Sequence, residues 1–167
     1  MKVYLGTDHA GFELKEKVKK YLTENGYTVE DCGAFSFDKN DDYPDFISKV
    51  GEAISKTPTD RGIVFGGSGQ AEAMLANKYK NVRAALFYAP RIPPHAIDAN
   101  GNTSQDPFEM LRLTREHNDS NILSIGARLL TEQEALKAIS LWLTTPFPGD
   151  SRHVRRIEKM AQIEQKI

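Results

Sequence analysis

The sequence has little cysteine, no long apolar run and no excess of charge of one sign. It contains one cysteine, Cys32, in 167 residues, which excludes an internal disulfide and a zinc site built from several cysteines. The 22 basic and 23 acidic residues give a net charge of −1, without a basic run of the kind that binds nucleic acid. The apolar stretches are far too short to cross a bilayer, and Met1 leads directly into an expected strand without a leader segment. We therefore expect a cytoplasmic protein that binds neither nucleic acid nor membrane.

Segments typical of strands and helices alternate along the chain. Short apolar runs predict strands at 2–6, 27–31, 61–65, 82–87 and 121–125. Apolar periodicity and end signals predict helices at 12–25, 43–55, 70–77 and 107–117, from Thr131 to just before Pro146, and from Asp150 onward. This alternation predicts a single α/β domain over residues 1–167. Its fold should be Rossmann-like and doubly wound, a five-stranded parallel sheet with helices on both faces.

A glycine-rich turn follows the third predicted strand. Residues 66–69 read Gly-Gly-Ser-Gly, and a helix begins after them. Glycine lets the backbone approach a ligand closely, and free N–H groups at a helix start favour an anion or a developing negative oxygen. Glu72 lies about one turn into the helix and can point back at this turn as a base. The alternative is an ordinary strand-to-helix turn with a solvated Glu72. The turn lacks the Lys of a P-loop and the spacing of a dinucleotide fingerprint.

Polar residues also follow two other predicted strands. Asp8 and His9 come after the first strand and Arg128 after the fifth, so we expect them at the same sheet edge as the glycine turn. Asp8 and His9 could hydrogen-bond sugar hydroxyls, and with equal weight they could cap the next helix. The connection at 88–106 is long and rich in Pro, Asn and Gly, which favours a functional or interface role.

The remaining candidates lie near helix ends. His117 could exchange protons near neutral pH or could only interact with a helix dipole. Arg152, Arg155 and Arg156 share one face of the last predicted helix. Grouped arginines suit a phosphate group, although an exposed charged helix is the commoner explanation.

Six motifs in order resemble the sugar-phosphate isomerase family of ribose-5-phosphate isomerase B, which also holds allose- and galactose-6-phosphate isomerases. The resemblance runs from Val3 to the last helix. The motifs that carry it are Thr7–Phe12, Asp42–Pro44, Gly66–Gly69 with Ala76–Lys78, Glu116–Asn121, Gly126–Arg128 and Arg152–Arg156.

The resemblance implies an aldose–ketose isomerase that acts on ribose 5-phosphate and ribulose 5-phosphate through a cis-enediolate. Many family members have a catalytic cysteine where this chain has Gly66, and a second branch has glycine there and a glutamate that matches Glu72. By resemblance Glu72 is then the base, Ser68 and nearby N–H groups stabilise the enediolate, and His117 opens the sugar ring with help from Asp8.

The resemblance also implies the remaining site residues. The phosphate-binding residues would be His9, Arg128, Arg152 and Arg156. The substrate-binding residues would be Asp8, His9, Tyr43, Gly67, Ser68, Gly69, Gln70, Ala71 and Asn118. No metal and no nicotinamide cofactor are implied, because the reaction only relocates protons. The family forms homodimers with sites shared between subunits, and pairing of dimers into tetramers stays open.

One departure from the family is the connection at 88–106, which is longer than usual. It leaves open a larger substrate, such as a six-carbon aldose phosphate. A non-catalytic sugar-phosphate binding module and a nucleotide-binding domain are the alternatives from other classes.

Overall fold

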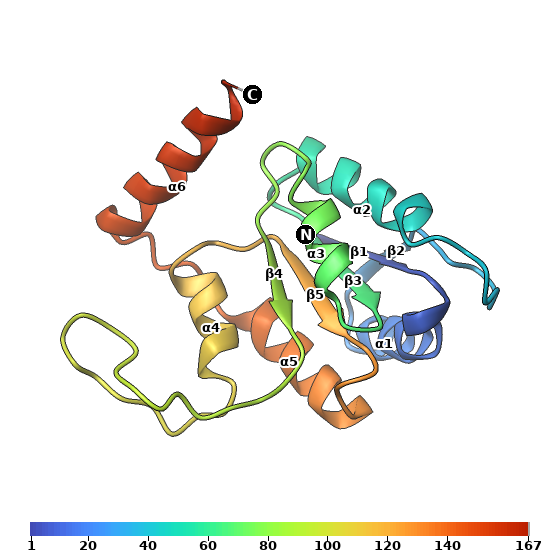
Figure 1. The fold of residues 1–167 in the computed structure, drawn as a ribbon, viewed down its shortest axis with the longest axis horizontal. Helices are drawn as coiled ribbons and strands as arrows, with labels where there is room; N and C mark the ends of the chain where they lie inside the picture. The colour runs from blue at the N-terminus through green and yellow to red at the C-terminus, as the bar shows by residue number, and fades with distance from the viewer. Residues whose placement is uncertain (167) are drawn as a thin grey trace.

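The computed structural model describes residues 1–166 and contains a five-stranded sheet in the order β2-β1-β3-β5-β4 (Figure 1). All four strand pairings are parallel. The strands are β1 (Lys2–Thr7), β2 (Thr28–Asp31), β3 (Arg61–Gly66), β4 (Ala84–Phe87) and β5 (Ile122–Gly126). The helices are the short 3₁₀ helix η1 (His9–Gly11) and α1 (Phe12–Glu24), α2 (Pro44–Lys56), α3 (Gln70–Ala76), α4 (Glu109–Glu116), α5 (Glu132–Thr144) and α6 (Ser151–Glu164).

Apolar side chains of the central strands are buried on both faces of the sheet. In β3, Ile63 and Phe65 pack into one core cluster with residues of α1, α4 and α5, including the fully buried Trp142. The intervening Val64 packs into a second cluster with residues of α2 and α3. Continuous apolar runs are typical of parallel strands covered on both sides, and the predicted doubly wound α/β fold is confirmed.

Two segments project from this layered body. Helix α6 stands away from the sheet in Figure 1, and its Met160 and Ile163 are exposed. Residues 88–108 form neither helix nor strand and extend as a long loop on the side of α4. Among the described residues, no helix is long and apolar enough to span a membrane.

The main differences from the sequence predictions lie at element ends. The fourth strand starts at Ala84 rather than at 82, and α4 covers Glu109–Glu116 rather than 107–117. The N-cap of α4 is Phe108, whose backbone N–H donates to the Asp106 carboxylate at 2.9 Å. The predicted helix start at Thr131 is confirmed, with a capping box between Thr131 and Glu134.

Candidate active site

The carboxyl ends of β1 and β3 lie side by side at the point where the chain reverses its direction across the sheet. From β1 the chain proceeds to β2 on one side, whereas β3 and the later strands lie on the other side. Thr7 is the register partner of Phe65, and Gly66 is the partner of Gly126. The segments after β1, β3 and β5 therefore share one edge, at the place where doubly wound sheets bind ligands.

The glycine turn after β3 is held by the strand beside it. Gly69 has a φ of 76°, in the left-handed region that glycine adopts freely. Its carbonyl accepts the Ser124 hydroxyl at 2.6 Å. The carbonyl oxygens of Gly66 and Gly67 accept N–H groups from the residues after β5, Ala127 and Arg128, at 2.8 and 3.1 Å. The backbone of this turn is thus anchored to β5 along its length.

Glu72 is buried above the same turn, with 5% of its surface exposed. A Cβ atom at position 66 would lie 2.0 Å from both the carboxyl carbon and one carboxyl oxygen of Glu72. The carboxyl group thus occupies the space that any side chain at position 66 would need. Gly66 and Glu72 are therefore sterically linked, and the sequence could not reveal this contact.

The surroundings of Glu72 favour its protonated form more than water does. Burial raises the pKa of the Glu72 carboxyl most, a backbone hydrogen bond lowers it, and the negative charge of Asp8 adds a smaller increase. A carboxylate with a raised pKa is a stronger base than a free one, which suits the abstraction of a proton from carbon.

The other residues of the turn connect Gly66 with the helix that carries Glu72. Ser68 is half-buried, and its hydroxyl lies 3.4 Å from the Gln70 N–H. Gln70 is exposed and Ala71 half-buried at the start of α3. The turn and the first turn of α3 thus supply a hydroxyl, backbone N–H groups and a buried carboxylate, which are the groups that proton abstraction next to a carbonyl needs.

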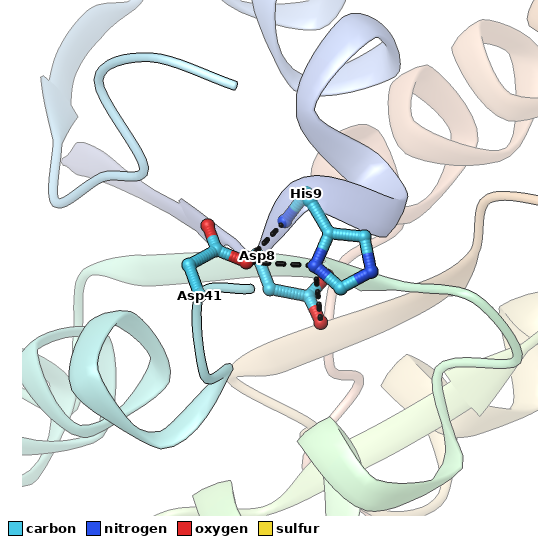
Figure 2. Close-up of side chains that lie close together, drawn as sticks. All are labelled: Asp8, His9 and Asp41. Carbon is cyan, nitrogen blue, oxygen red and sulfur yellow. Dashed lines mark hydrogen bonds and ion pairs between the residues drawn. The ribbon is translucent and has the colours of Figure 1, made fainter. Parts of the chain in front are cut away.

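Asp8 and His9 adjoin the turn from β1, together with a third residue that sequence reasoning missed. One oxygen of Asp8 accepts the Ala10 N–H at 2.9 Å, so the expected capping contact is present. Asp41 comes from the loop before α2, and its Oδ1 lies 2.7 Å from His9 Nδ1 (Figure 2). In the sequence Asp41 looks like an ordinary polar loop residue, because no local pattern indicates its contact with a residue 32 positions away.

The ligand atoms of Asp8, His9 and Asp41 all lie within 4.8 Å of one another, a spacing that a metal ion could also use. The 2.7 Å contact between His9 and Asp41 is that of a charge-assisted hydrogen bond.

Tyr43 follows at the N-cap of α2 and packs against the core cluster on that face.

His9 and Arg128 line one cleft of about 400 Å³. Arg128 also lies beside the glycine turn, since its guanidinium would be 3.3 Å from a Cβ at Gly67. A positively charged arginine and an imidazole in one cleft next to a glycine turn suit an anionic group such as phosphate.

A second group of candidate residues lies at the opposite edge of the sheet. His117 follows α4 and precedes β5, so it lies near the amino ends of the parallel strands. Its ring stacks on that of His153 from α6, with centroids 4.2 Å apart and the planes 11° apart. Asn118 is exposed beside it, and Arg152 and Arg156 are exposed on α6. Within one chain these residues are not brought together with Glu72.

The segment that carries His117 is firmly anchored. The buried Arg115 guanidinium donates to the carbonyls of Ser120 and Thr145 and pairs with Asp119 at 2.8 Å. Trp142 Nε1 donates to the Ser120 hydroxyl at 2.8 Å. His117 is thus presented on a rigid surface although its own ring is half-exposed.

The whole chain is similar to known sugar-phosphate isomerases. The family model described as ribose/galactose isomerase matches residues 3–102 and 104–160. The chain belongs to this family. It is 39% identical to ribose-5-phosphate isomerase B of Mycolicibacterium paratuberculosis over 165 residues, which cover 99% of this chain and 92% of that protein. It is 32% identical to ribose-5-phosphate isomerase B of Escherichia coli, over 99% of this chain and 97% of that protein.

A solved structure of a family member matches as well. The ribose-5-phosphate isomerase B of Mycoplasma genitalium with bound ribulose 5-phosphate has a TM-score of 0.85 at 32% identity, covering 99% of this chain and 97% of that one. These matches confirm the resemblance to the isomerase family and the expectation that the chain is an isomerase.

The contact between Gly66 and Glu72 makes a structural prediction. We expect Gly66→Ala to displace the Glu72 carboxyl group, because the new Cβ would lie 2.0 Å from it. The displaced group should gain water contacts, which lowers its pKa. A crystal structure and an NMR titration of the side-chain carboxyl group would measure both effects.

Gly67→Ala is the matched control, because the three atoms nearest to its Cβ all belong to the flexible Arg128 side chain, the closest at 3.3 Å. An unmoved carboxyl group with an unchanged pKa in Gly66→Ala would contradict the steric link.

Proposed function

We propose that the protein interconverts ribose 5-phosphate and ribulose 5-phosphate, with Glu72 as the base that moves a proton between C2 and C1. The observation that carries this proposal is the buried Glu72 carboxyl group above the glycine turn, in the space that a side chain at position 66 would fill. Family membership supports the reaction class, and the bound ribulose 5-phosphate of the Mycoplasma genitalium relative supports the substrate.

The proposed reaction only relocates protons. Glu72 takes the proton from C2 of the open-chain aldose, and the electron pair moves through C1 to its oxygen, giving a cis-enediolate. The same carboxyl group returns the proton to C1, while the oxygen atoms exchange theirs, giving the ketose. The Ser68 hydroxyl and the backbone N–H groups of residues 67–70 stabilise the negative oxygen. No electron leaves the sugar, so the chemistry requires no nicotinamide.

The sugar ring must open before this step. We assign ring opening to His117, which moves a proton between the ring oxygen and the hydroxyl on C1. Asp8 holds the ring oxygen or the hydroxyl groups, and Asn118 and Tyr43 contact the substrate. His9 and Arg128 bind the phosphate group, together with Arg152 and Arg156.

Two subunits are needed to assemble this site. Glu72 follows β3 at its carboxyl end, whereas His117 precedes β5 at its amino end, so both cannot reach one sugar within a chain. A homodimer in which His117 of the partner subunit faces Glu72 resolves the difficulty. Exposed apolar side chains on α3 and α6, namely Met74, Met160 and Ile163, are suited to such an interface.

A six-carbon aldose phosphate is the alternative substrate. It is favoured by the loop residues Asp98 and Asn100, which line a cleft together with His117 and Arg152 and could contact a longer sugar. We expect kcat/KM to be highest for ribose 5-phosphate in a panel with allose and galactose 6-phosphates. A higher value for a hexose phosphate would establish the alternative, and tight binding without turnover of any sugar would favour a non-catalytic binding module.

The role of Glu72 is tested by Glu72→Gln. We expect kcat to fall by at least about 100-fold with KM changed little, because the amide cannot accept the proton but fills the same space. Glu52→Gln, at an exposed position on α2, is the matched control and should keep full activity. Retention of activity by Glu72→Gln would show that another group is the base.

Sharing of sites between subunits is tested by mixing two inactive variants. Glu72→Gln and His117→Asn each remove one group from every site of a homodimer. A mixed dimer would contain one site with both groups intact, since the intact Glu72 and the intact His117 come from different chains. After unfolding and refolding together, we expect about a quarter of wild-type activity from statistical pairing. If each site were built within one chain, mixing would restore nothing.

A further inference from the structure

Asp41 contacts His9 through a single carboxyl oxygen. Its Oδ1 accepts the backbone N–H of His9 at 2.9 Å and lies 2.7 Å from His9 Nδ1. The other oxygen, Oδ2, is buried and has no hydrogen-bond partner among the described residues. The Asp41 side chain is 10% exposed. In Figure 2 it approaches the imidazole from the side of Nδ1, and within residues 1–166 His9 is the only residue that forms an ion pair with this carboxylate.

This contact determines which nitrogen of His9 carries hydrogen. An ionised carboxylate can only accept hydrogen bonds, so Nδ1 must donate. The second ring nitrogen, Nε2, points away from Asp41 in Figure 2. His9 lines the cleft that it shares with Arg128, whereas Asp41 does not line this cleft. Asp41 therefore does not contact an anion bound in this cleft, and its hydrogen bond reaches the cleft only through the imidazole.

We propose that Asp41 is a positioning residue that keeps His9 doubly protonated, so that Nε2–H of His9 donates to the phosphate group of the substrate. This inference rests on the proposed function, in which His9 binds that phosphate. A neutral imidazole with its hydrogen on Nδ1 would instead turn a lone pair on Nε2 toward the anion. The charge of His9 therefore decides whether this contact attracts or repels.

Some of the groups around His9 raise its pKa and others lower it. The hydrogen bond to Asp41 raises the pKa of His9 most, burial lowers it, the charges of Asp8 and Asp41 raise it, and the charge of Arg128 lowers it. Asp8 Oδ2 lies 4.0 Å from Nδ1. The raised pKa means that His9 stays charged to a higher pH than a free imidazole and loses its charge as the pH rises through that value.

The other charged residues of the cleft affect the pKa of His9 less than Asp41, Asp8 and Arg128 do. Lys17 and Glu132 line the cleft but pair with each other at 2.8 Å, and Glu13 lines it as well. Without Asp41, burial and the nearby Arg128 would both favour the neutral imidazole. An acidic residue behind a phosphate-binding histidine thus strengthens the site although its own charge has the wrong sign for the ligand.

The first experiment measures His9 directly, without catalysis. NMR titration of the four histidine rings, with His9→Asn used for assignment, should give a lower His9 pKa in Asp41→Asn than in the wild type. The amide still accepts hydrogen bonds, so the variant removes charge while keeping the contact. Asp42→Asn, at the exposed neighbouring position, is the matched control and should leave the titration unchanged. An unchanged His9 titration in Asp41→Asn would overturn the inference.

The second experiment measures phosphate affinity. We expect KM for ribose 5-phosphate in Asp41→Asn to exceed the wild-type value by about tenfold near pH 8, with the ratio approaching one near pH 5.5 and kcat changed little. Protonation of the substrate phosphate cancels from this ratio, since it affects both proteins equally. A loss confined to kcat, or a KM ratio independent of pH, would overturn the inference.

The third experiment separates this inference from the proposed function. Calorimetric binding of inorganic phosphate should weaken in Asp41→Asn and in His9→Asn, and the double variant should bind no more weakly than His9→Asn alone. The inference would be overturned if Asp41→Asn weakened phosphate binding as much in the His9→Asn variant as it does in the wild type, because Asp41 would then act independently of His9. If these binding effects appear but no sugar phosphate is turned over, the role of Asp41 stands and the proposed function falls.

Discussion

The site depends on one steric relation, the Glu72 carboxyl group filling the space left by the missing side chain of Gly66. A carboxylate reaches this buried position only because position 66 is a glycine, and burial in turn raises the pKa of that carboxylate. The hydrogen bonds from the segment after β5 hold the turn in place beneath it. Catalytic competence, in the function proposed for this chain, thus follows from packing at a single backbone position.

The direction of the strands explains why the candidate residues form two separate groups. In a parallel sheet every strand ends at the same edge, so the direction of the strands alone brings the residues after β1, β3 and β5 together. His117 comes before a strand, and the same rule assigns it to the opposite edge. A second copy of the chain is the simplest way to join two such surfaces, which makes assembly a part of the proposed chemistry.

Negative charge gathers near the cleft expected to bind a dianionic phosphate. Burial and, to a smaller extent, the charge of Asp8 raise the pKa of Glu72, and the hydrogen bond to Asp41 raises that of His9. Both effects favour the protonated form of the side chain. For Glu72 the result is a stronger base, and for His9 the result is a retained positive charge. The cost in repulsion is limited because Asp41 lies behind the imidazole and does not line the cleft.

Local patterns in the sequence were enough to predict the order of elements, the parallel doubly wound sheet, the helix start at Thr131 and the convergence of Asp8, His9 and Arg128 with the glycine turn. These features depend on periodicity and on position relative to a strand, which neighbouring residues determine. Only the tertiary structure decided that Glu72 fills the space at Gly66 and that Asp41 contacts His9 across 32 positions of the chain. Such contacts depend on how separate elements pack, which no local pattern specifies.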